Sequence, residues 1–444
     1  MTTRTVHFVT LGCPKNIVDS ERMHRLAADQ GISAVDDPAA AEVIVVNTCG
    51  FIEAAKQESI DTILKMAEYK QQGTLQALIV AGCLSQRYPE ELARELPEVD
   101  HFLGTTDFAT LREILAERER RRQAVGQPLL MNEQEYRRQL IGPPHSAYLK
   151  ISEGCDRPCA FCSIPLMRGK QRSRTIDSLV EEARTLAESG VVELILVAQD
   201  STAYGRDLEP SVRLTDLLRA LDQVQSLEWI RLHYAYPSMI SEALAQTIAG
   251  CQRVIPYLDL PIQHVDDTVL RRMRRGYTEQ VVRERLEILR KHLPEVVIRT
   301  TFLLGHPGET DRAHQRLLSF LQDAELDNVG AFVFSAEDGT AALDQPDPVS
   351  AEVAEQRRQE VMALQQQISR NKLRRRIGQR LKVMVDGISA ESEFLLEGRY
   401  YGQSPEIDGT VTITDAARCS PGTILEVQIT DSADYDLVGS AAPA

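Results

Sequence analysis

The sequence predicts an α/β protein built from three units: a parallel α/β unit, a partial (β/α)6 barrel and a small five-stranded β-barrel. The first two are indicated by short segments rich in Val, Ile and Leu that alternate with helical patterns, up to about residue 120 and again from Ala147. The third is indicated by a tail of short, β-rich segments punctuated by glycine. Because 444 residues exceed one ordinary core, we expect units at 1–120, 145–372 and 373–444, with a linker at 121–144.

The N-terminal unit is predicted to contain a parallel sheet. Its apolar segments are short enough to be buried strands, and they lie at residues 5–12, 42–47 and 77–82. Helical patterns follow these strands, at residues 20–30, 54–69 and 89–95. Strand and helix therefore alternate, which is typical of a parallel sheet whose strand ends meet at one edge.

A change in composition indicates a surface linker after this unit. The run ERERRRQ at 117–123 is dense in charge, and IGPPHS at 141–146 contains a proline pair. Neither composition continues the alternation of strand and helix.

The central unit repeats the alternation six times, which predicts an incomplete barrel. Helical patterns such as 178–189 and 278–292 separate the strands. In a barrel of this type, the active site lies at the C-terminal ends of the strands. The six expected strands lie at residues 147–152, 193–199, 229–234, 257–262, 296–304 and 328–335.

The C-terminal part begins with a long charged helix at 350–378 and then changes character. From about Leu381 the segments KVMVDG, GTVTIT and TILEVQIT are short and rich in β-branched residues. They predict a five-stranded barrel of the size that binds a macromolecule.

Composition limits the cellular setting. The formal net charge is −15, which argues mildly against non-specific binding to nucleic acid. No apolar stretch is long enough to span a bilayer, and the start MTTRTVHFVT lacks a signal-peptide pattern. We therefore expect a cytoplasmic protein without membrane contact. In a reducing compartment, its eight cysteines indicate metal or redox chemistry more than disulfides.

Three cysteines follow the first strand of the central unit. Cys155, Cys159 and Cys162 have the spacing C-x3-C-x2-C, so one short loop can hold three thiolates around one side of a cubic cluster. Four thiolates would saturate a four-iron cluster, whereas three leave one iron open for a substrate or cofactor. The alternative from the residues alone is a zinc ion that these thiols hold together with a distant ligand.

Three further cysteines are far apart in the sequence but occupy equivalent positions in the predicted sheet. Cys13, Cys49 and Cys83 each come just after a predicted strand of the N-terminal unit. Because the carboxyl ends of parallel strands converge, these thiols can meet and hold a second open cluster. The alternative is three separate buried cysteines. Cys251 and Cys419 have no cysteine neighbours at ligand spacing, and we expect no metal role for them.

The chain resembles the radical S-adenosylmethionine superfamily through its three-cysteine loop, and the methylthiotransferases through Cys13, Cys49 and Cys83. The resemblance covers nearly the whole chain, including a TRAM domain at the C-terminus. Several local runs carry it as well: RGKQRSR (168–174), PIQHVDDTVLRRMRRGY (261–277), GHPGET (305–310) and FSAEDGTAA (334–342).

Two branches of this family must be separated, because one modifies an adenosine in transfer RNA and the other an aspartate in small-subunit ribosomal protein twelve. The runs LGCPKNIVDSE (11–21) and LLEGRYYGQSPEIDG (395–409) resemble the ribosomal-protein branch. From residue 381 onward, eleven acidic residues face three basic ones, a net charge of −8. Such a tail would repel a phosphate backbone and attract a basic ribosomal protein.

The resemblance implies two [4Fe–4S] clusters and S-adenosylmethionine as cofactors. A radical generated at the first cluster removes a hydrogen from the β-carbon of the aspartate, which is not acidic enough for a side-chain base. The second cluster presents sulfur, and a second S-adenosylmethionine supplies the methyl group. The implied partners are a basic small-subunit ribosomal protein, free or within the ribosome, and an electron donor such as a flavodoxin or ferredoxin. No transfer-RNA substrate is expected.

Further residues are candidates for cofactor or substrate contacts. Gln199 and Asp200 end the second strand of the central unit, and His264 follows the fourth as a possible donor to the substrate carboxylate. Arg271, Arg272, Arg274 and Arg275 form a basic run that either meets a carboxylate or lies on a solvated helix face. The residues predicted to bind S-adenosylmethionine are Phe161, beside the adenine, and Gln199, Gln263 and Arg299.

Two other functions are compatible with the same cysteines. The first is a transfer-RNA adenosine methylthiotransferase with both clusters. The second is a non-enzymatic iron–sulfur protein that docks on the ribosome and senses redox state. The three-cysteine loop argues against the sensor, because a purely structural or sensing cluster has no need of an open iron.

Overall fold

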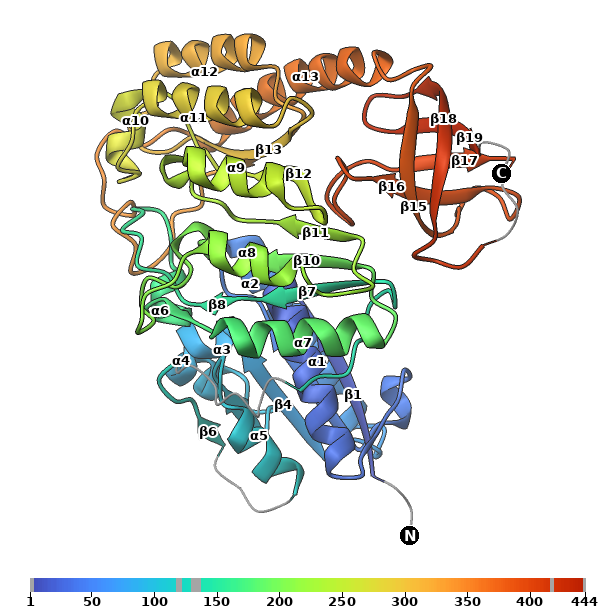
Figure 1. The fold of residues 1–444 in the computed structure, drawn as a ribbon. Helices are drawn as coiled ribbons and strands as arrows, with labels where there is room; N and C mark the ends of the chain where they lie inside the picture. The colour runs from blue at the N-terminus through green and yellow to red at the C-terminus, as the bar shows by residue number, and fades with distance from the viewer. Residues whose placement is uncertain (1–3, 117–121, 129–136, 416–418, 442–444) are drawn as a thin grey trace.

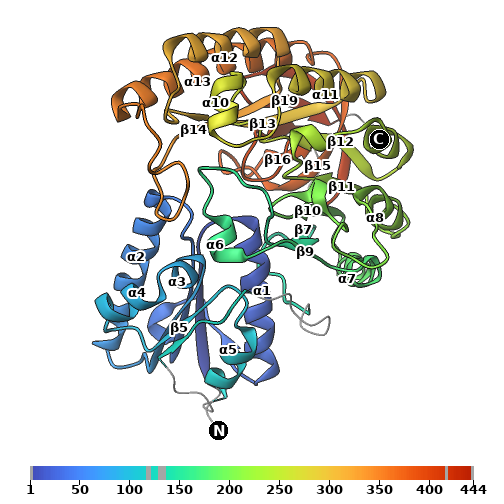
Figure 2. The same ribbon diagram turned by 90° about the vertical axis from the view of Figure 1, so that its left-hand side faces the viewer.

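The computed structural model describes residues 4–116, 122–128, 137–415 and 419–441. The N-terminal sheet unit lies against one side of the (β/α)6 unit, and the C-terminal barrel packs elsewhere on the same unit (Figures 1 and 2). The predicted fold class is confirmed. Among the helices of the described residues, none is long and apolar enough to cross a membrane.

The N-terminal unit is a six-stranded sheet in the order β2-β1-β3-β4-β5-β6, with all strands parallel. Side chains of α1 and α5 cover one face, and those of α2, α3 and α4 cover the other. The elements are β1 Thr5–Thr10, α1 Pro14–Asp29, β2 Ser33–Ala34, β3 Val43–Thr48, α2 Glu53–Ala67, β4 Ala77–Gly82, α3 Cys83–Arg87, α4 Pro89–Glu95, β5 His101–Leu103, α5 Phe108–Leu115 and β6 Gln123–Ala124.

The (β/α)6 unit is an open parallel sheet in the order β14-β13-β12-β11-β10-β7, so its two edge strands do not pair with each other. Leu194, Leu196, Ile230 and Leu232 alternate along their strands and pack outward against the helices. The strands are β7 Ser146–Lys150, β10 Glu193–Val197, β11 Trp229–Leu232, β12 Val254–Asp259, β13 Val297–Leu304 and β14 Asn328–Val333. The helices are α6 Ile164–Arg168, α7 Ile176–Glu188, α8 Leu214–Leu221, α9 Glu242–Gly250, α10 Asp267–Arg272, α11 Glu279–His292, α12 Asp311–Ala324 and α13 Ala351–Arg374.

The C-terminal part is a closed five-stranded barrel in the order β15-β16-β17-β19-β18. Valines and isoleucines such as Val383, Val411 and Ile413 fill its interior. The strands are β15 Arg380–Ile388, β16 Leu396–Tyr400, β17 Val411–Thr414, β18 Ile424–Ser432 and β19 Leu437–Ala441. Closure pairs every edge strand, which explains how so small a unit keeps its shape.

One loop of this barrel, residues 401–409, packs into the (β/α)6 unit. Arg231 of β11 donates to the Tyr401 carbonyl at 2.8 Å, and the Tyr257 hydroxyl of β12 donates to Asp408 at 2.7 Å. Ser404 hydrogen-bonds His233 at 2.9 Å. The two units are therefore joined by buried polar contacts as well as by the chain.

The elements differ from the sequence prediction at several boundaries. The first helix begins at Pro14 rather than residue 20, because Cys13 rather than a typical capping side chain starts it. β2, β5 and β6 are too short to give an apolar pattern, and β6 lies inside the segment predicted as a linker. Much of the rest of that predicted linker, including residues 129–136, lies outside the described residues.

Candidate active site

The first cysteine set lies on the loop between a short strand, β8 Ser152–Glu153, and α6. The Cys155 amide donates to the Gly169 carbonyl at 3.0 Å, which closes the base of the loop. Ala160, between the second and third cysteines, donates to Met273 at 2.9 Å and accepts from Ala342 at 2.8 Å. Both neighbouring segments therefore hold the loop in one shape.

Arg275 is the buried cation beside this loop. Its Nη1 donates to Cys159 Sγ at 3.2 Å, and its Nε donates to the Tyr277 hydroxyl at 2.9 Å. The guanidinium also stacks over the Tyr236 ring, 4.4 Å from the centroid. These contacts fix the guanidinium against the sulfur of Cys159.

The other two thiols of the loop are buried. Burial raises the pKa of Cys155 to about 11 and that of Cys162 to about 12. Both are therefore protonated at neutral pH in the metal-free protein, and metal binding must release those protons.

The second set is assembled by the sheet. Cys13, Cys49 and Cys83 follow β1, β3 and β4, which are consecutive neighbours in the strand order. Gly12 has a φ of +92°, and a Cβ placed on it would lie 2.8 Å from the Cys49 Cβ. The first two cysteine loops therefore touch, and only glycine permits that approach.

Asn16 links the three strand ends. Its Nδ2 donates to the Leu11 carbonyl at 2.8 Å and to the Thr48 carbonyl at 3.1 Å. Its Oδ1 accepts from Arg168 Nη2 at 2.7 Å and lies 4.0 Å from Cys83 Sγ. This single side chain thus contacts the residues around all three cysteines.

Burial and a nearby charge act on the Cys83 thiol in opposite directions. Burial raises the pKa of Cys83 to about 12, against an opposing effect of the Arg168 guanidinium. Across the described ranges, no group of three or more His, Cys, Asp or Glu side chains is arranged to hold a metal ion. A [4Fe–4S] cluster is larger than one ion, and thiolates at three of its corners stand correspondingly further apart.

The two cysteine sets lie at the same interface between units. Arg168, at the end of α6, donates to Asp19 of α1 at 2.8 Å and to Glu153 at 3.2 Å. Lys150 of β7 bridges the same two carboxylates at 2.5 and 2.7 Å. This buried network of ionic hydrogen bonds fixes α1, and with it Cys13, against the (β/α)6 unit.

The segment between β14 and α13, residues 334–350, makes a second connection between the (β/α)6 unit and the N-terminal unit, and is called the strap below. Glu337, 1 % exposed, accepts from Arg87 at 2.8 Å and lies 3.1 Å from Lys56, both of the N-terminal unit. Burial opposes ionisation, but hydrogen bonds from Ser335, Arg87 and Lys56 outweigh it and lower the pKa of Glu337. The Glu337 carboxylate is therefore charged, and these contacts hold it in place.

The predicted cofactor residues lie in different surroundings. Gln199 donates to Glu153 at 2.9 Å, at the end of β10. Phe161 packs against Val269 and Met273. Gln263 is held by backbone pairing with β13 and has a φ of +73°. Arg299 already pairs with Asp259 at 3.3 Å and with Asp408 of the C-terminal barrel at 3.4 Å. Their cofactor roles stay predictions.

The remaining candidates separate clearly. Asp200 accepts from Arg157 at 2.7 Å and caps the turn that follows. His264 is fully buried, accepts from the Asp266 amide at 2.9 Å, and burial lowers its pKa to about 3, so it is neutral. In the arginine run, Arg272 pairs with Asp347 at 2.7 Å, and Arg271 and Arg274 are exposed. Arg275 is the member that turns toward the cysteines.

The polar atoms near the first set fit an additional ligand. Gln199 Oε1 and Arg157 Nη2 are buried and have no hydrogen-bond partner within the described protein. A buried polar atom without a partner is costly, so both are free to contact a polar cofactor such as S-adenosylmethionine. These two atoms and the three thiols of the loop fit S-adenosylmethionine bound to a cluster iron that has no protein ligand.

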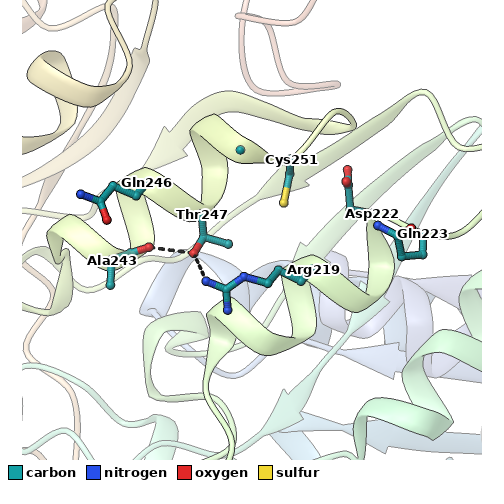
Figure 3. Close-up of a pocket in the computed structure, with 8 residues that line it drawn as sticks. Arg219, Asp222, Gln223, Ala243, Gln246, Thr247 and Cys251 are labelled. Atoms are coloured by element: carbon teal, nitrogen blue, oxygen red, sulfur yellow. Dashed lines mark hydrogen bonds between the residues drawn. The ribbon is translucent and has the colours of Figure 1, made fainter.

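Cys251 lies far from this arrangement. It borders a cavity of about 390 Å³ between the C-terminal ends of α8 and α9, with Arg219, Asp222 and Thr247 (Figure 3). Helix C-termini lie at the opposite end of a β/α unit from the strand C-termini. Cys251 therefore lies at the opposite end of the (β/α)6 unit from the strand C-termini.

Comparison with known families divides the chain in the same way as its fold. Three family models match: "Uncharacterized protein family UPF0004" at residues 5–104, "Radical SAM superfamily" at 149–321 and "TRAM domain" at 377–441.

Similar proteins then decide the family. "Ribosomal protein uS12 methylthiotransferase RimO" of Anaeromyxobacter sp. (strain K) is 50 % identical over 439 residues, 99 % of this chain and 93 % of the relative. The proteins of that name from Myxococcus xanthus and Geobacter sulfurreducens are 48 % and 47 % identical, over 98 % of this chain and 91 % and 98 % of theirs. The chain belongs to the RimO family. It is a radical S-adenosylmethionine methylthiotransferase, and the predicted enzyme class and cofactors of this family are confirmed.

Solved structures agree on the fold at a greater distance. The radical S-adenosylmethionine methyltransferase TsrM from Kitasatospora setae superposes with a TM-score of 0.59 at 14 % identity, covering 77 % of this chain and 74 % of TsrM. A second TsrM structure, with tryptophan and aza-SAM, gives a TM-score of 0.57 at 13 % identity, with coverage of 86 % and 78 %. Both likenesses concern the fold alone.

Proposed function

We propose that this RimO-family enzyme adds a methylthio group to the β-carbon of an aspartate in ribosomal protein uS12. The observation that supports it most is the meeting of two cysteine sets, one on a loop and one on three strand ends, at a single interface. Cys155, Cys159 and Cys162 would hold one [4Fe–4S] cluster, and Cys13, Cys49 and Cys83 the other. When bound, these groups and S-adenosylmethionine supply a radical, a sulfur atom and a methyl group.

The protein's own residues position the reactants and exclude water. Arg275 donates a hydrogen bond to Cys159 Sγ, and Asn16 holds the strand-end set together. Gln199 and Arg157 have free polar atoms for S-adenosylmethionine, and Phe161 offers an aromatic face for its adenine. The ion pairs of Arg168 and Glu337 keep the two sets at a constant separation. Precise spacing matters because a radical transfers only between groups in near contact.

The C-terminal barrel supports a basic protein partner. Its exposed acids include Glu391, Glu393, Asp415, Glu426 and Asp431. Asp386 and Asp408 instead bind side chains of the (β/α)6 unit. An acidic outer face would steer the basic uS12, free or within the ribosome, toward the enzyme. We infer a cytoplasmic location, where uS12 and an electron donor such as a flavodoxin or ferredoxin are found.

The test compares substrates. The anaerobically reconstituted enzyme is incubated with dithionite, S-adenosylmethionine and either uS12 or transfer RNA, and mass spectrometry follows the gain of a methylthio group. Modified uS12 supports the proposal, and modification of transfer RNA alone overturns it. Failure to form 5′-deoxyadenosine would favour the redox sensor. Iron analysis should give about eight irons per chain for two clusters.

A further inference from the structure

Lys15 is a buried amine with no carboxylate partner among the described residues. Its side chain is 7 % exposed, its Nζ donates to the Ala198 carbonyl at 3.3 Å, and it lies 3.4 Å from the centroid of the Tyr234 ring. Within the described part of the chain it forms no ion pair within 4.0 Å, whereas nearby Lys150 and Arg168 each bind two carboxylates. An ammonium group buried in this way is unfavourable unless an anion reaches it.

The location of Lys15 suggests which anion. It stands in the first turn of α1, two residues after Cys13, and crosses the interface to the end of β10. The acceptor Ala198 directly precedes Gln199, whose Oε1 is unpartnered. The amine therefore reaches from the strand-end set to the C-terminal end of a strand of the (β/α)6 unit, where the active site of such a unit lies.

We propose that Lys15 binds the carboxylate of the substrate aspartate. This inference rests on the proposed function. In aspartate the reacting β-carbon is bonded directly to the carboxylate carbon, so a cation that holds the carboxylate also fixes the reacting C–H bond. An adenine carries no carboxylate and would leave the amine unpaired, which makes Lys15 a specificity residue as well.

A double-mutant cycle tests the contact. Reconstituted holoenzyme, unreduced and anaerobic, is titrated with fluorescently labelled uS12 and with a uS12 variant in which the target aspartate is asparagine. The wild-type enzyme should bind the aspartate form about tenfold or more tightly than the asparagine form, as expected for a charged hydrogen bond. Lys15→Met should bind both forms equally.

Two further variants keep the result interpretable. Lys15→Arg retains the charge and should keep part of the preference for aspartate. Lys70→Met removes a lysine of the same unit that pairs with Asp100, away from the interface, and should keep the full preference. Iron content and the electron paramagnetic resonance of both clusters establish that each variant is loaded.

The outcomes separate this inference from the proposed function. A Lys15→Met enzyme that still prefers aspartate overturns the role of Lys15. So does one in which only the spectrum or reduction potential of the strand-end cluster changes, because Lys15 would then merely balance the charge of that cluster. A wild-type enzyme that modifies transfer RNA but not uS12 overturns the proposed function instead.

Discussion

The two cysteine sets are built in different ways. Cys155, Cys159 and Cys162 lie within eight residues of one loop, and backbone hydrogen bonds to Gly169, Met273 and Ala342 shape it. The strand-end set spans seventy-one residues and exists only because β1, β3 and β4 are neighbours. The first is therefore a local property of the sequence, and the second is a property of the fold. A disturbance of the N-terminal unit should affect the second set alone.

Substitution of single cysteines should distinguish the roles of the two sets most clearly. Cys159→Ala should abolish both 5′-deoxyadenosine and methylthiolated product, because we propose that the loop set holds the cluster that starts the chemistry. Cys49→Ala should abolish the product and leave cleavage of S-adenosylmethionine. Iron content should fall from about eight to about four per chain in each variant. Equal loss of 5′-deoxyadenosine in both would contradict the division of labour.

Asn16 tests whether the strand-end set depends on the fold around it. Asn16→Ala removes the side-chain donor to the Leu11 and Thr48 carbonyls and the acceptor of Arg168 Nη2, which should destabilise the N-terminal unit by about 1–3 kcal/mol. We expect the strand-end cluster to be lost in part while the loop cluster stays intact. Mössbauer or paramagnetic resonance spectra can count the two clusters separately. The exposed Gln57→Ala, whose amide bonds Asp61, serves as the control.

Glu337 tests the coupling of the sets rather than either set alone. Glu337→Gln weakens the contacts of the strap with Arg87 and Lys56. Both clusters should therefore still form, but the distance between them should be less fixed. The ratio of methylthiolated product to 5′-deoxyadenosine should fall several-fold as uncoupled cleavage rises. Glu53→Gln removes the other, exposed partner of Lys56 and should leave the ratio unchanged. An unchanged ratio in Glu337→Gln would show that the strap is dispensable.

The last expected effect concerns stability rather than product formation, through the titration of Glu309. Burial raises the pKa of Glu309 to about 7, so its carboxyl is more easily ionised in the unfolded chain. The free energy of unfolding should therefore decrease as pH rises from the unfolded pKa, near 4.5, to about 7, by about 1–3 kcal/mol. Urea denaturation of the metal-free protein at pH 5 and pH 7.5 measures this. Glu309→Gln should flatten the difference.

The sequence places Cys155, Cys159 and Cys162 on one loop because their spacing is local, and their role as cluster ligands stays a prediction. It also predicted the strand-end positions of Cys13, Cys49 and Cys83, since apolar segments end there. It did not single out Asn16 or Glu337, although both lie in runs that resemble the family. Polar contacts between units depend on tertiary packing, which periodicity does not encode.

Arg299 and the arginine run illustrate the same limit. Arg299 lies near a strand end, but the sequence could not show that Asp408, more than a hundred residues later, would pair with it. Four arginines in one run look equivalent in sequence, and packing against Tyr236 and Tyr277 selects Arg275. Of the five barrel strands, β16 and β19 lack an apolar pattern that would predict them, because glycine and charge interrupt it.

The loop 401–409 has a consequence for which targets the enzyme can serve. Its contacts with Arg231, His233 and Tyr257 hold the C-terminal barrel rigidly on the (β/α)6 unit. The span from the outer acids of that barrel to the six cysteines is therefore constant. A protein bound to these acids can bring to the cysteines only a residue on a segment long enough to span this distance. The length of that segment would therefore select the target before the aspartate itself is recognised.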